Sequence, residues 1–464
     1  MSVPFDKNQT VAKAPLSWGG HIRATLALGL PLAGAQLAQM AINTTDVVML
    51  GWYGTAELAA SVLATQAFFV IFMFGGGFAH AVVPIASQAE GRNDEQQVRR
   101  SVRMGLWIAA LFSLLVMPIL WNIELLLTWF QQEPALVKLA GEYMRIAQWG
   151  MFPAVGALAL RSFFSAVSRT QIILWSTIVG TISNAFFNWV FIFGNLGSPE
   201  LGVRGAAIAS VASTLMIFLV LVFWIAARPY FARYELFVRF WRPDWSAFFE
   251  ILKLGLPIAI TIVAEVSLFF ASSVMMGWLG TVALAAHGIS LQLISLAFMI
   301  PLGLSSAATV RVGQAFGRAD GSGLKMAAKS SLVVAAVIAF ASAMVLWLLA
   351  GPLVGLFLDN SEPDAAIVLA TAIPLLMVAA GFQFFDSMQV TGVGLLRGLK
   401  DTRRPLIIAV ISYWAIGMPT AYLLGIRAGF EGPGIWSGLA IGLAVAAVAL
   451  NLRFFRMMRE LSFT

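Results

Sequence analysis

The sequence of 464 residues contains no cysteine and only three histidines. Without cysteine the chain can form no disulfide, no thiolate metal site and no cysteine nucleophile. His21, His80 and His287 do not follow the spacing of a metal-binding motif, so we expect no metal site built on histidine. The sequence also has no Walker A pattern, and no phosphate-binding lysine follows the glycines at 75–77. These absences argue against ATP as the energy source of this chain alone.

Catalytic constellations are missing as well. An enzyme embedded in a membrane would need clustered histidine and aspartate ligands, or a serine paired with lysine or histidine at one depth. The sequence offers neither arrangement. We therefore expect no enzymatic activity and no bound cofactor.

Charged residues are scarce, at 11% of the chain, whereas 60% of the residues are hydrophobic. A soluble domain has roughly 25% charged residues, and a chain this apolar could not cover its surface in water. Apolar runs of 18 or more residues recur along the sequence, which is typical of membrane-spanning helices. The formal net charge of +7 would suggest nucleic acid in a soluble protein. Here we expect no nucleic-acid partner, because lysine and arginine gather in the cytoplasmic loops of membrane proteins.

The apolar runs predict an all-α integral membrane protein with twelve transmembrane helices. Their predicted ranges are 27–52, 58–86, 103–121, 138–166, 171–194, 205–227, 250–278, 284–312, 325–347, 364–396, 404–425 and 433–455. The longest polar stretch lies between the sixth and seventh ranges. The sequence thus predicts a first lobe over residues 1–227, a cytoplasmic linker over 228–249 and a second lobe over 250–464.

An internal repeat supports the division into two halves. Residues 28–94 align without a gap with residues 254–320, and about 25 of the 67 aligned positions are identical. Pro31 aligns with Pro257, and the endings SQAEGRND and GQAFGRAD align with each other. Each half has six spans, an even number, so both halves enter the membrane from the same side. The halves are therefore parallel repeats, related by an axis along the membrane normal.

The distribution of basic residues predicts the orientation in the membrane. One set of loops holds most of the lysines and arginines, among them Lys7, Lys13, Arg99, Arg100, Arg242, Arg311, Arg397 and Arg403. The opposite set holds Lys138, Arg204 and Arg427 together with acids such as Asp359, Glu362 and Asp364. Because basic loops stay in the cytoplasm, we expect both termini there. We expect a multi-pass protein of the inner membrane, surrounded by lipid and working as a monomer.

Three carboxylates fall inside predicted spans: Asp46, Glu265 and Asp386. An aspartate at the centre of a membrane helix costs roughly 2.5–3.5 kcal/mol, so each of them needs a reason to be there. No lysine or arginine is expected at matching depth, except Arg161 in the fourth span. One alternative is a carboxylate that is protonated, or hydrogen-bonded between helices for packing alone. The other is a functional site in the transport path.

The repeat alignment places the acids at different depths. Asp46 aligns with Ser272, and Glu265 aligns with Gln39. Glu265 is therefore expected seven residues, or roughly 10 Å, nearer the cytoplasm than Asp46. The two halves share a scaffold but differ in their chemistry.

Polar neighbours of the acids can be inferred from helical spacing. Asn43 precedes Asp46 by three residues. Asn184 and Asn188 lie on the same stripe of the fifth span, where they form either a binding site or hydrogen bonds that hold helices together. The polar or aromatic candidates for the lining of a substrate site are Gln39, Asn43, Gln66, Gln292, Phe382 and Gln383. Oxygens beside Glu265 and Asp386 suit a sodium ion, and a buried carboxylate also suits a proton. The sequence leaves both ions open.

The chain resembles the MATE family, named for multidrug and toxic compound extrusion, and in particular its NorM-like bacterial branch. The similarity rests on TTDVVMLGWYG, AAHGISLQLISLAFMIPLGLSSAATVRVGQAFGRAD and FDSMQVTGVGLLRGLKDTRRPLIIAVISYWAIGMPT, and it extends over nearly the whole chain. The resemblance implies a V-shaped pair of six-helix lobes that alternates between outward- and inward-facing states.

The resemblance also implies secondary active export of cationic or amphipathic drugs by antiport with H⁺ or Na⁺. On this analogy Asp46, Asn184 and Asn188 form a site in the first lobe, and Glu265 and Asp386 bind the coupling cation in the second. NorM-like relatives place a tyrosine one turn before the last of these acids, where this chain has Phe382. The alternative function is that of a related two-lobed flippase for lipid-linked precursors. Its usual additional spans and basic cavity are not expected here.

Overall fold

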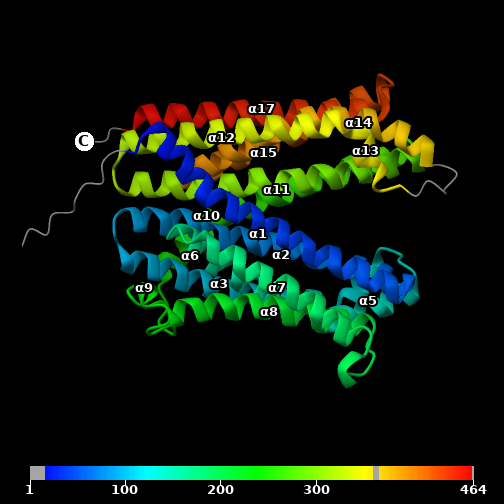
Figure 1. The fold of residues 1–464 in the computed structure, drawn as a ribbon, viewed down its shortest axis with the longest axis horizontal. Coiled ribbons are helices and arrows are strands. Elements are labelled where there is room, and N and C mark those ends of the chain that lie inside the picture. Colours follow the sequence, from blue (N-terminus) through cyan, green and yellow to red (C-terminus); the bar gives the residue numbers. More distant parts are fainter. Residues whose placement is uncertain (1–15, 359–364, 462–464) are drawn as a thin grey trace, which may run out of the picture.

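The protein is a bundle of long helices, described by a computed structural model for residues 16–358 and 365–461 (Figure 1). The first half contains α1 (Trp18–Tyr53), α2 (Thr55–Gly91), α3 (Glu95–Trp121), α4 (Ile123–Trp129), α5 (Pro134–Ala147), α6 (Met151–Ala166), α7 (Thr170–Phe191), α8 (Val203–Ala227) and the short α9 (Pro229–Ala232). The second half contains α10 (Trp245–Trp278), α11 (Thr281–Gly317), α12 (Gly321–Leu348), α13 (Ala350–Gly355), α14 (Ala365–Gly398), α15 (Arg403–Val410), α16 (Met418–Tyr422) and α17 (Glu431–Glu460).

The prediction of an all-α membrane protein with twelve spans is confirmed. Within residues 16–358 and 365–461, ten helical segments are long and apolar enough to cross a membrane. The other two passes are α7 and the pair α5 and α6, which a 3-10 turn at Gln148–Gly150 joins. The eleventh pass is irregular, because π-helical turns at Ile411–Gly417 and Leu423–Arg427 interrupt it. Lys7, Lys13, Asp359, Glu362 and Asp364, used above to predict orientation, lie outside the described residues.

Aspartate caps fix where several helices begin. Asp94 accepts a hydrogen bond from the backbone nitrogen of Gln97, and its repeat equivalent Asp320 accepts one from Gly323. Asp244 does the same for Ala247, so α10 begins at Trp245 rather than at the predicted residue 250. A side-chain oxygen at this position satisfies a backbone donor that the first turn leaves unpaired.

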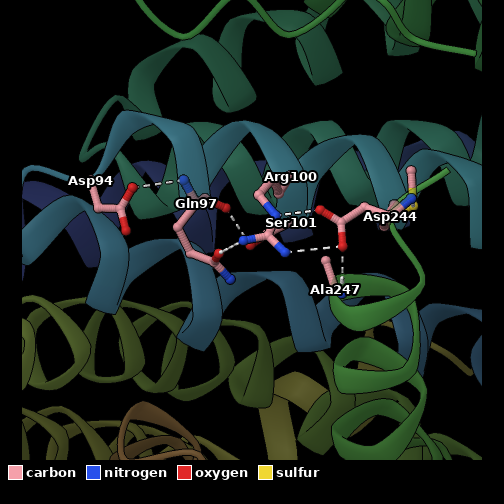
Figure 2. Close-up of polar contacts among 7 residues, drawn as sticks. Asp94, Gln97, Arg100, Ser101, Asp244 and Ala247 are labelled. Atoms are coloured by element: carbon pink, nitrogen blue, oxygen red, sulfur yellow. Dashed lines mark hydrogen bonds and ion pairs between the residues drawn. The ribbon is translucent and has the colours of Figure 1, made fainter. Parts of the chain in front are cut away.

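The segment between the lobes is held against the first lobe. Phe231 and Tyr234 are buried, and their rings pack on Phe163. Figure 2 shows the end of the segment, where Arg100 of α3 bonds with both carboxylate oxygens of Asp244. The predicted linker is thus fixed to α3 up to the first turn of α10.

The lobes meet mainly through two equivalent pairs of helices, α1 with α11 and α2 with α10, and α2 also packs on α11. In Figure 1, α14 and α17 lie on one side of α1, and α3 and α8 lie on the other. Gly303 of α11 lies so close to α1 that a Cβ there would be 2.4 Å from the nitrogen of Ala33. A Cβ at the repeat-equivalent Gly77 would likewise be 2.4 Å from the Cα of Ala259. The two contacts are exchanged when each residue is replaced by its repeat equivalent. This is the twofold relationship that parallel repeats predict.

The closest contacts lie toward the end that carries the basic loops. A Cβ at Gly91 would be 2.3 Å from the carbonyl oxygen of Gln314, and one at Gly317 would be 2.1 Å from that of Gln88. From this end the helices of the two lobes diverge (Figure 1). The lobes therefore form a V whose closed apex is at the end of the basic loops.

Candidate functional site

Asp46 of α1 is held by three hydrogen bonds inside the first lobe. Its Oδ1 accepts from Asn184 Nδ2 at 2.9 Å and from Asn188 Nδ2 at 2.6 Å, both from α7. Its Oδ2 accepts from Ser210 Oγ of α8 at 3.1 Å. The two asparagines are fully buried, and Asn188 Nδ2 also donates to Asn184 Oδ1. The structure thus brings together the three residues of the predicted first-lobe site.

Two neighbours of Asp46 were not predicted, and one predicted neighbour is absent. Ser210 and the buried Tyr143, which interacts electrostatically with Asp46, come from helices that show no pattern pointing to them. Asn43 is exposed and is not among the hydrogen-bond partners of Asp46. A spacing of three residues leaves two side chains about 60° apart around a helix. That rotation is enough to turn Asp46 toward α7 while Asn43 faces outward.

The second-lobe acids, Glu265 of α10 and Asp386 of α14, are close enough to interact electrostatically. Asp386 is 3% exposed, and its Oδ1 has no hydrogen-bond partner among the described residues. One turn earlier, the fully buried Gln383 has no partner for either amide atom. One turn later, Gln389 Nε2 donates to Tyr413 Oη at 2.6 Å, and its Oε1 is unpaired. The second lobe therefore contains three buried oxygens at three-residue spacing without a hydrogen-bond donor.

The remaining predicted lining residues divide into exposed and buried groups. Gln66 and Gln292, which are repeat equivalents on α2 and α11, are exposed. Phe382 and Gln383 are fully buried, and the Phe382 ring packs on Trp436 and Phe269. In this arrangement these two residues lie inside the second lobe rather than on an accessible wall.

The expectation that no lysine or arginine except Arg161 lies at the depth of the acids was wrong for one residue. Arg397, at the end of α14, interacts electrostatically with Glu265 and Tyr413. The predicted span ends at residue 396, so Arg397 was counted among the basic residues of the loops; it follows Asp386 by eleven residues, roughly 16 Å of helix. A long side chain points back toward the start of its helix, which shortens that separation. Arg161 bonds with Gln39 and Thr177 rather than with Asp46.

The two sites differ in what they can bind. Hydrogen-bond donors already occupy both oxygens of Asp46, which leaves little room for a metal ion. A proton is small enough to bind there, and it would displace one of these donors. The second lobe instead offers carboxylate and amide oxygens, which are the ligands that a hard cation prefers. Within the described residues, no group of three or more His, Cys, Asp or Glu side chains could hold a metal ion. A sodium ion in the second lobe would therefore need the amide oxygens in addition to Glu265 and Asp386.

Comparisons with known proteins give a consistent result. The chain is 50% identical over 456 residues to the "Probable multidrug resistance protein NorM" of Rhizobium meliloti (strain 1021), with 98% of each chain covered. It is 48% identical over 452 residues to the protein of the same name from Agrobacterium fabrum (strain C58 / ATCC 33970), with 97% of each covered.

The fold has solved counterparts. One structure, described as the outward-facing conformation of a multidrug resistance MATE family transporter of the MOP superfamily, superposes with a TM-score of 0.86. It is 22% identical in sequence, and the match covers 95% of this chain and 96% of that one. The sequence itself matches MatE over residues 31–190 and 257–423, which is most of both repeats. The chain belongs to the MatE family.

Proposed function

We propose that this protein is a secondary active multidrug efflux transporter that exports cationic or amphipathic compounds by antiport with H⁺ or Na⁺. The relatives named as probable multidrug resistance proteins support the substrate class, since identity reaches 50% over nearly the full chain. The observation that carries the coupling is the placement of carboxylates inside both lobes. Asp46 is enclosed by three donors, and Asp386 has an unpaired buried oxygen. Acids inside a membrane protein typically mark an ion path.

In the proposed mechanism the two lobes alternate between an outward-facing and an inward-facing arrangement. With the lobes joined at the basic-loop end, a substrate would leave from the opposite end. A coupling ion that binds more tightly to one arrangement shifts the equilibrium by that difference in affinity and by no more. One inward charge contributes about 2.3 kcal/mol per 100 mV, enough to export a neutral compound up a gradient of roughly fiftyfold. A monovalent cationic substrate exchanged for one ion gains only from the chemical gradient of that ion.

The proposed location is the inner membrane of a bacterium, with both termini in the cytoplasm and the protein acting as a monomer. Support comes from the positions of Arg99, Arg100 and Arg403 at helix ends near the closed apex, since such residues stay on the cytoplasmic side. Arg204 and Arg427 lie at helix ends on the side of the membrane away from the closed apex. On this orientation the V opens toward the outside of the cell.

The two lobes are proposed to differ in how a bound ion acts on them. Asp46 accepts only from neutral donors, so protonation would release Asn184, Asn188 or Ser210 and alter the packing of α1 on α7 and α8. The second lobe combines Glu265 and Asp386 with amide oxygens, a set that suits either a proton or sodium. Phe382 supplies no hydroxyl oxygen, so the choice between the ions depends on the residues around Asp386.

The test is efflux from proteoliposomes with sodium and proton gradients imposed separately. Purified protein is reconstituted, a fluorescent organic cation is loaded, and its release is followed after each gradient is applied. We expect gradient-dependent efflux with at least one ion and none in liposomes without protein. Equal release with and without both gradients would contradict antiport. Dependence on ATP alone would contradict the proposed energy source.

A further inference from the structure

A groove of about 470 Å³ opens on the surface of α1 near the end of the basic loops. Its volume lies within the range of roughly 300–1,000 Å³ that is typical of ligand sites. Two polar side chains line it, Arg23 of α1 and Gln171 at the start of α7, and both are exposed. Within the described part of the chain, Arg23 forms no ion pair. The rest of the lining is apolar and belongs to α1: Gly19, Ile22, Leu26, Ala27, Leu30 and Pro31.

The groove lies where α1 passes from one lobe to the other, an oblique course that Figure 1 shows in blue. The start of α1 packs on the second lobe. Leu26 contacts an apolar cluster of α11 and α12, and Arg311 of α11 donates to the His21 carbonyl at 2.9 Å. Further along, Thr181 of α7 donates to the carbonyl of Ala38 at 3.0 Å, which holds this part of α1 in the first lobe. A molecule in the groove would therefore contact α7 and the part of α1 that is bound to the second lobe.

The apolar wall of the groove is a surface for acyl chains. Ala27 and Leu30 are exposed although they lie within a helix that is long and apolar enough to cross a membrane. Arg23 lies one turn nearer the start of the helix than Ala27, so its guanidinium reaches toward the level of the lipid headgroups. Basic pockets between transmembrane helices on the cytoplasmic side bind anionic headgroups. An apolar wall with a cation at its outer end thus matches one anionic phospholipid.

The internal repeat gives a second and independent indication. Extended by one residue, the alignment pairs Ala27 of α1 with Lys253 of α10. Gln171 corresponds to Arg403, since each follows a threonine at the start of the fifth or the eleventh pass. Lys253 and Arg403 are exposed, and neither forms an ion pair with another described residue. Unpaired basic side chains therefore lie at both twofold-related positions where the lobes meet, although different residues supply the charge.

We propose that the groove binds one anionic phospholipid of the cytoplasmic leaflet, with an acyl chain along Leu26 and Leu30 and the phosphate at Arg23 and Gln171. Arginine suits this role because two of its donors match two oxygens of a phosphate. The bound lipid contacts α1 and α7 beside the closed apex, so it stabilises the closed arrangement. A ligand shifts such an equilibrium only by its difference in affinity for the two arrangements. The proposal rests on the membrane orientation proposed above and is independent of the exported compound.

The test is photolabelling of the full-length protein in nanodiscs of phosphatidylcholine. Each sample contains a lipid with a diazirine on one acyl chain and either a phosphatidylglycerol or a phosphatidylcholine headgroup, and labelled peptides are identified by mass spectrometry. Competition with unlabelled phosphatidylglycerol gives the relative affinity. Arg23→Gln removes the charge, and Ala27→Phe fills the groove without changing the charge. Arg456→Gln is the matched control, because Arg456 is exposed near the end of α17 and does not line the groove.

We expect the phosphatidylglycerol probe to label residues 22–31 and the start of α7 more strongly than the phosphatidylcholine probe does. Arg23→Gln should weaken the competition by about fivefold, the effect of one basic residue at an anionic lipid surface, and Arg456→Gln should leave it unchanged. Ala27→Phe should reduce labelling of these residues by both probes. Equal labelling by the two probes in the wild-type protein would overturn the proposal, and this outcome needs no variant. Displacement of the probe by an organic cation that the protein exports would assign the groove to substrate and also overturn it.

The effect on the apex has its own measurement. Spin labels on α2 and α11, which pack together across the lobes, report the distance between them in the same nanodiscs. Adding phosphatidylglycerol should raise the short-distance population in the wild-type protein and raise it less in Arg23→Gln. Binding at the groove without any change in this population would contradict the stabilisation of the closed arrangement. Neither measurement uses transport, so both test the groove separately from the efflux function.

Discussion

Gln88 of α2 donates its side-chain amide to the backbone carbonyl of Gly398, the last residue of α14, at 2.9 Å across the boundary between the lobes. Its repeat equivalent, Gln314 of α11, donates to the carbonyl of Ala166, the last residue of α6, at 2.8 Å. Each lobe thus donates a glutamine amide to the unpaired carbonyl at the C-terminal end of a helix in the other lobe. Such carbonyls lack an intrahelical partner, so the two amides complete both helices and join the lobes at once.

The first prediction concerns these two amides. A neutral hydrogen bond contributes about 1 kcal/mol net, so Gln88→Ala with Gln314→Ala should weaken the closed apex by about 2 kcal/mol, or roughly thirtyfold in the equilibrium between arrangements. Spin labels on α2 and α11, introduced in a chain that has no cysteine of its own, would report the distance distribution. We expect the short-distance population to fall. Gln171→Ala, an exposed site at the start of α7, is the control and should leave it unchanged.

The second prediction uses a position on the twofold axis. Ser87 and Gly313 are repeat equivalents and face each other, since a Cβ at Gly313 would be 2.9 Å from the Cβ of Ser87. Cysteines bridged by a disulfide have their Cβ atoms about 3.8 Å apart, so Ser87→Cys with Gly313→Cys should cross-link after a small adjustment. Oxidation should then hold the apex closed and abolish efflux, and a reductant should restore it. Full efflux by the quantitatively oxidised protein would show that the apex does not open during transport.

The third prediction concerns Asp46. Asparagine at this position keeps an oxygen for Asn184 and Asn188 but cannot change its charge. Asp46→Asn should therefore express and fold, yet lose the gradient of a cationic dye driven by protons, which a tenfold proton gradient could otherwise raise to about tenfold in one-for-one exchange. Thr44→Ala, two positions from Asp46 and exposed on the same helix, is the matched control and should transport normally. Proton-driven efflux at the wild-type level by Asp46→Asn would remove Asp46 from the coupling mechanism.

The fourth prediction separates the lobes. Glu265→Gln and Asp386→Asn should each abolish coupled efflux, because the two carboxylates are close enough to interact electrostatically and either variant removes one of them. If sodium is the ion, its binding heat in calorimetry should disappear in both variants and persist in Asp46→Asn. Retention of sodium binding by Glu265→Gln would contradict a shared site. Normal dye efflux by both variants under an imposed gradient would exclude the second lobe from coupling.

The sequence predicted the repeats, the spans and the carboxylates, because apolar length and isolated charges are local signals. The 67-residue repeat, whose copies lie 226 positions apart, also relates the lobe contacts to each other, since the pair Gly77 and Ala259 exchanges with the pair Gly303 and Ala33 under it. Ser210 could not be predicted, because a serine in an apolar helix gives no indication of its partner. The depth of Arg397 was also missed. Hydropathy ends the predicted span at residue 396 and takes no account of how far a long side chain extends back along its helix. Tertiary packing decides both.

The last prediction concerns the ion pair in Figure 2. Arg100 bonds with both oxygens of Asp244, and this arginine is the main cause that lowers the pKa of the Asp244 carboxyl from its ordinary value. A group whose pKa is lower in the folded protein stabilises it above its ordinary pKa, near 4, and loses that effect as pH falls through the lowered value. Asp244→Asn keeps a capping oxygen for Ala247 but lacks the charge. It should therefore lower the unfolding temperature at neutral pH, and the difference from wild type should shrink as the pH falls below about 4.

Asp244→Ala should cost about 1 kcal/mol more than Asp244→Asn, because it also removes the helix cap. Asp94→Asn is the matched control: Asp94 caps α3 through Gln97, with no arginine hydrogen-bonded to it. Its effect at neutral pH should be smaller, because no arginine hydrogen bond is lost with it. A difference between wild type and Asp244→Asn that stays constant down to pH 3 would mean that the Arg100 pair contributes nothing to stability. The attachment of the inter-lobe segment to α3 would then depend on its buried aromatic residues alone.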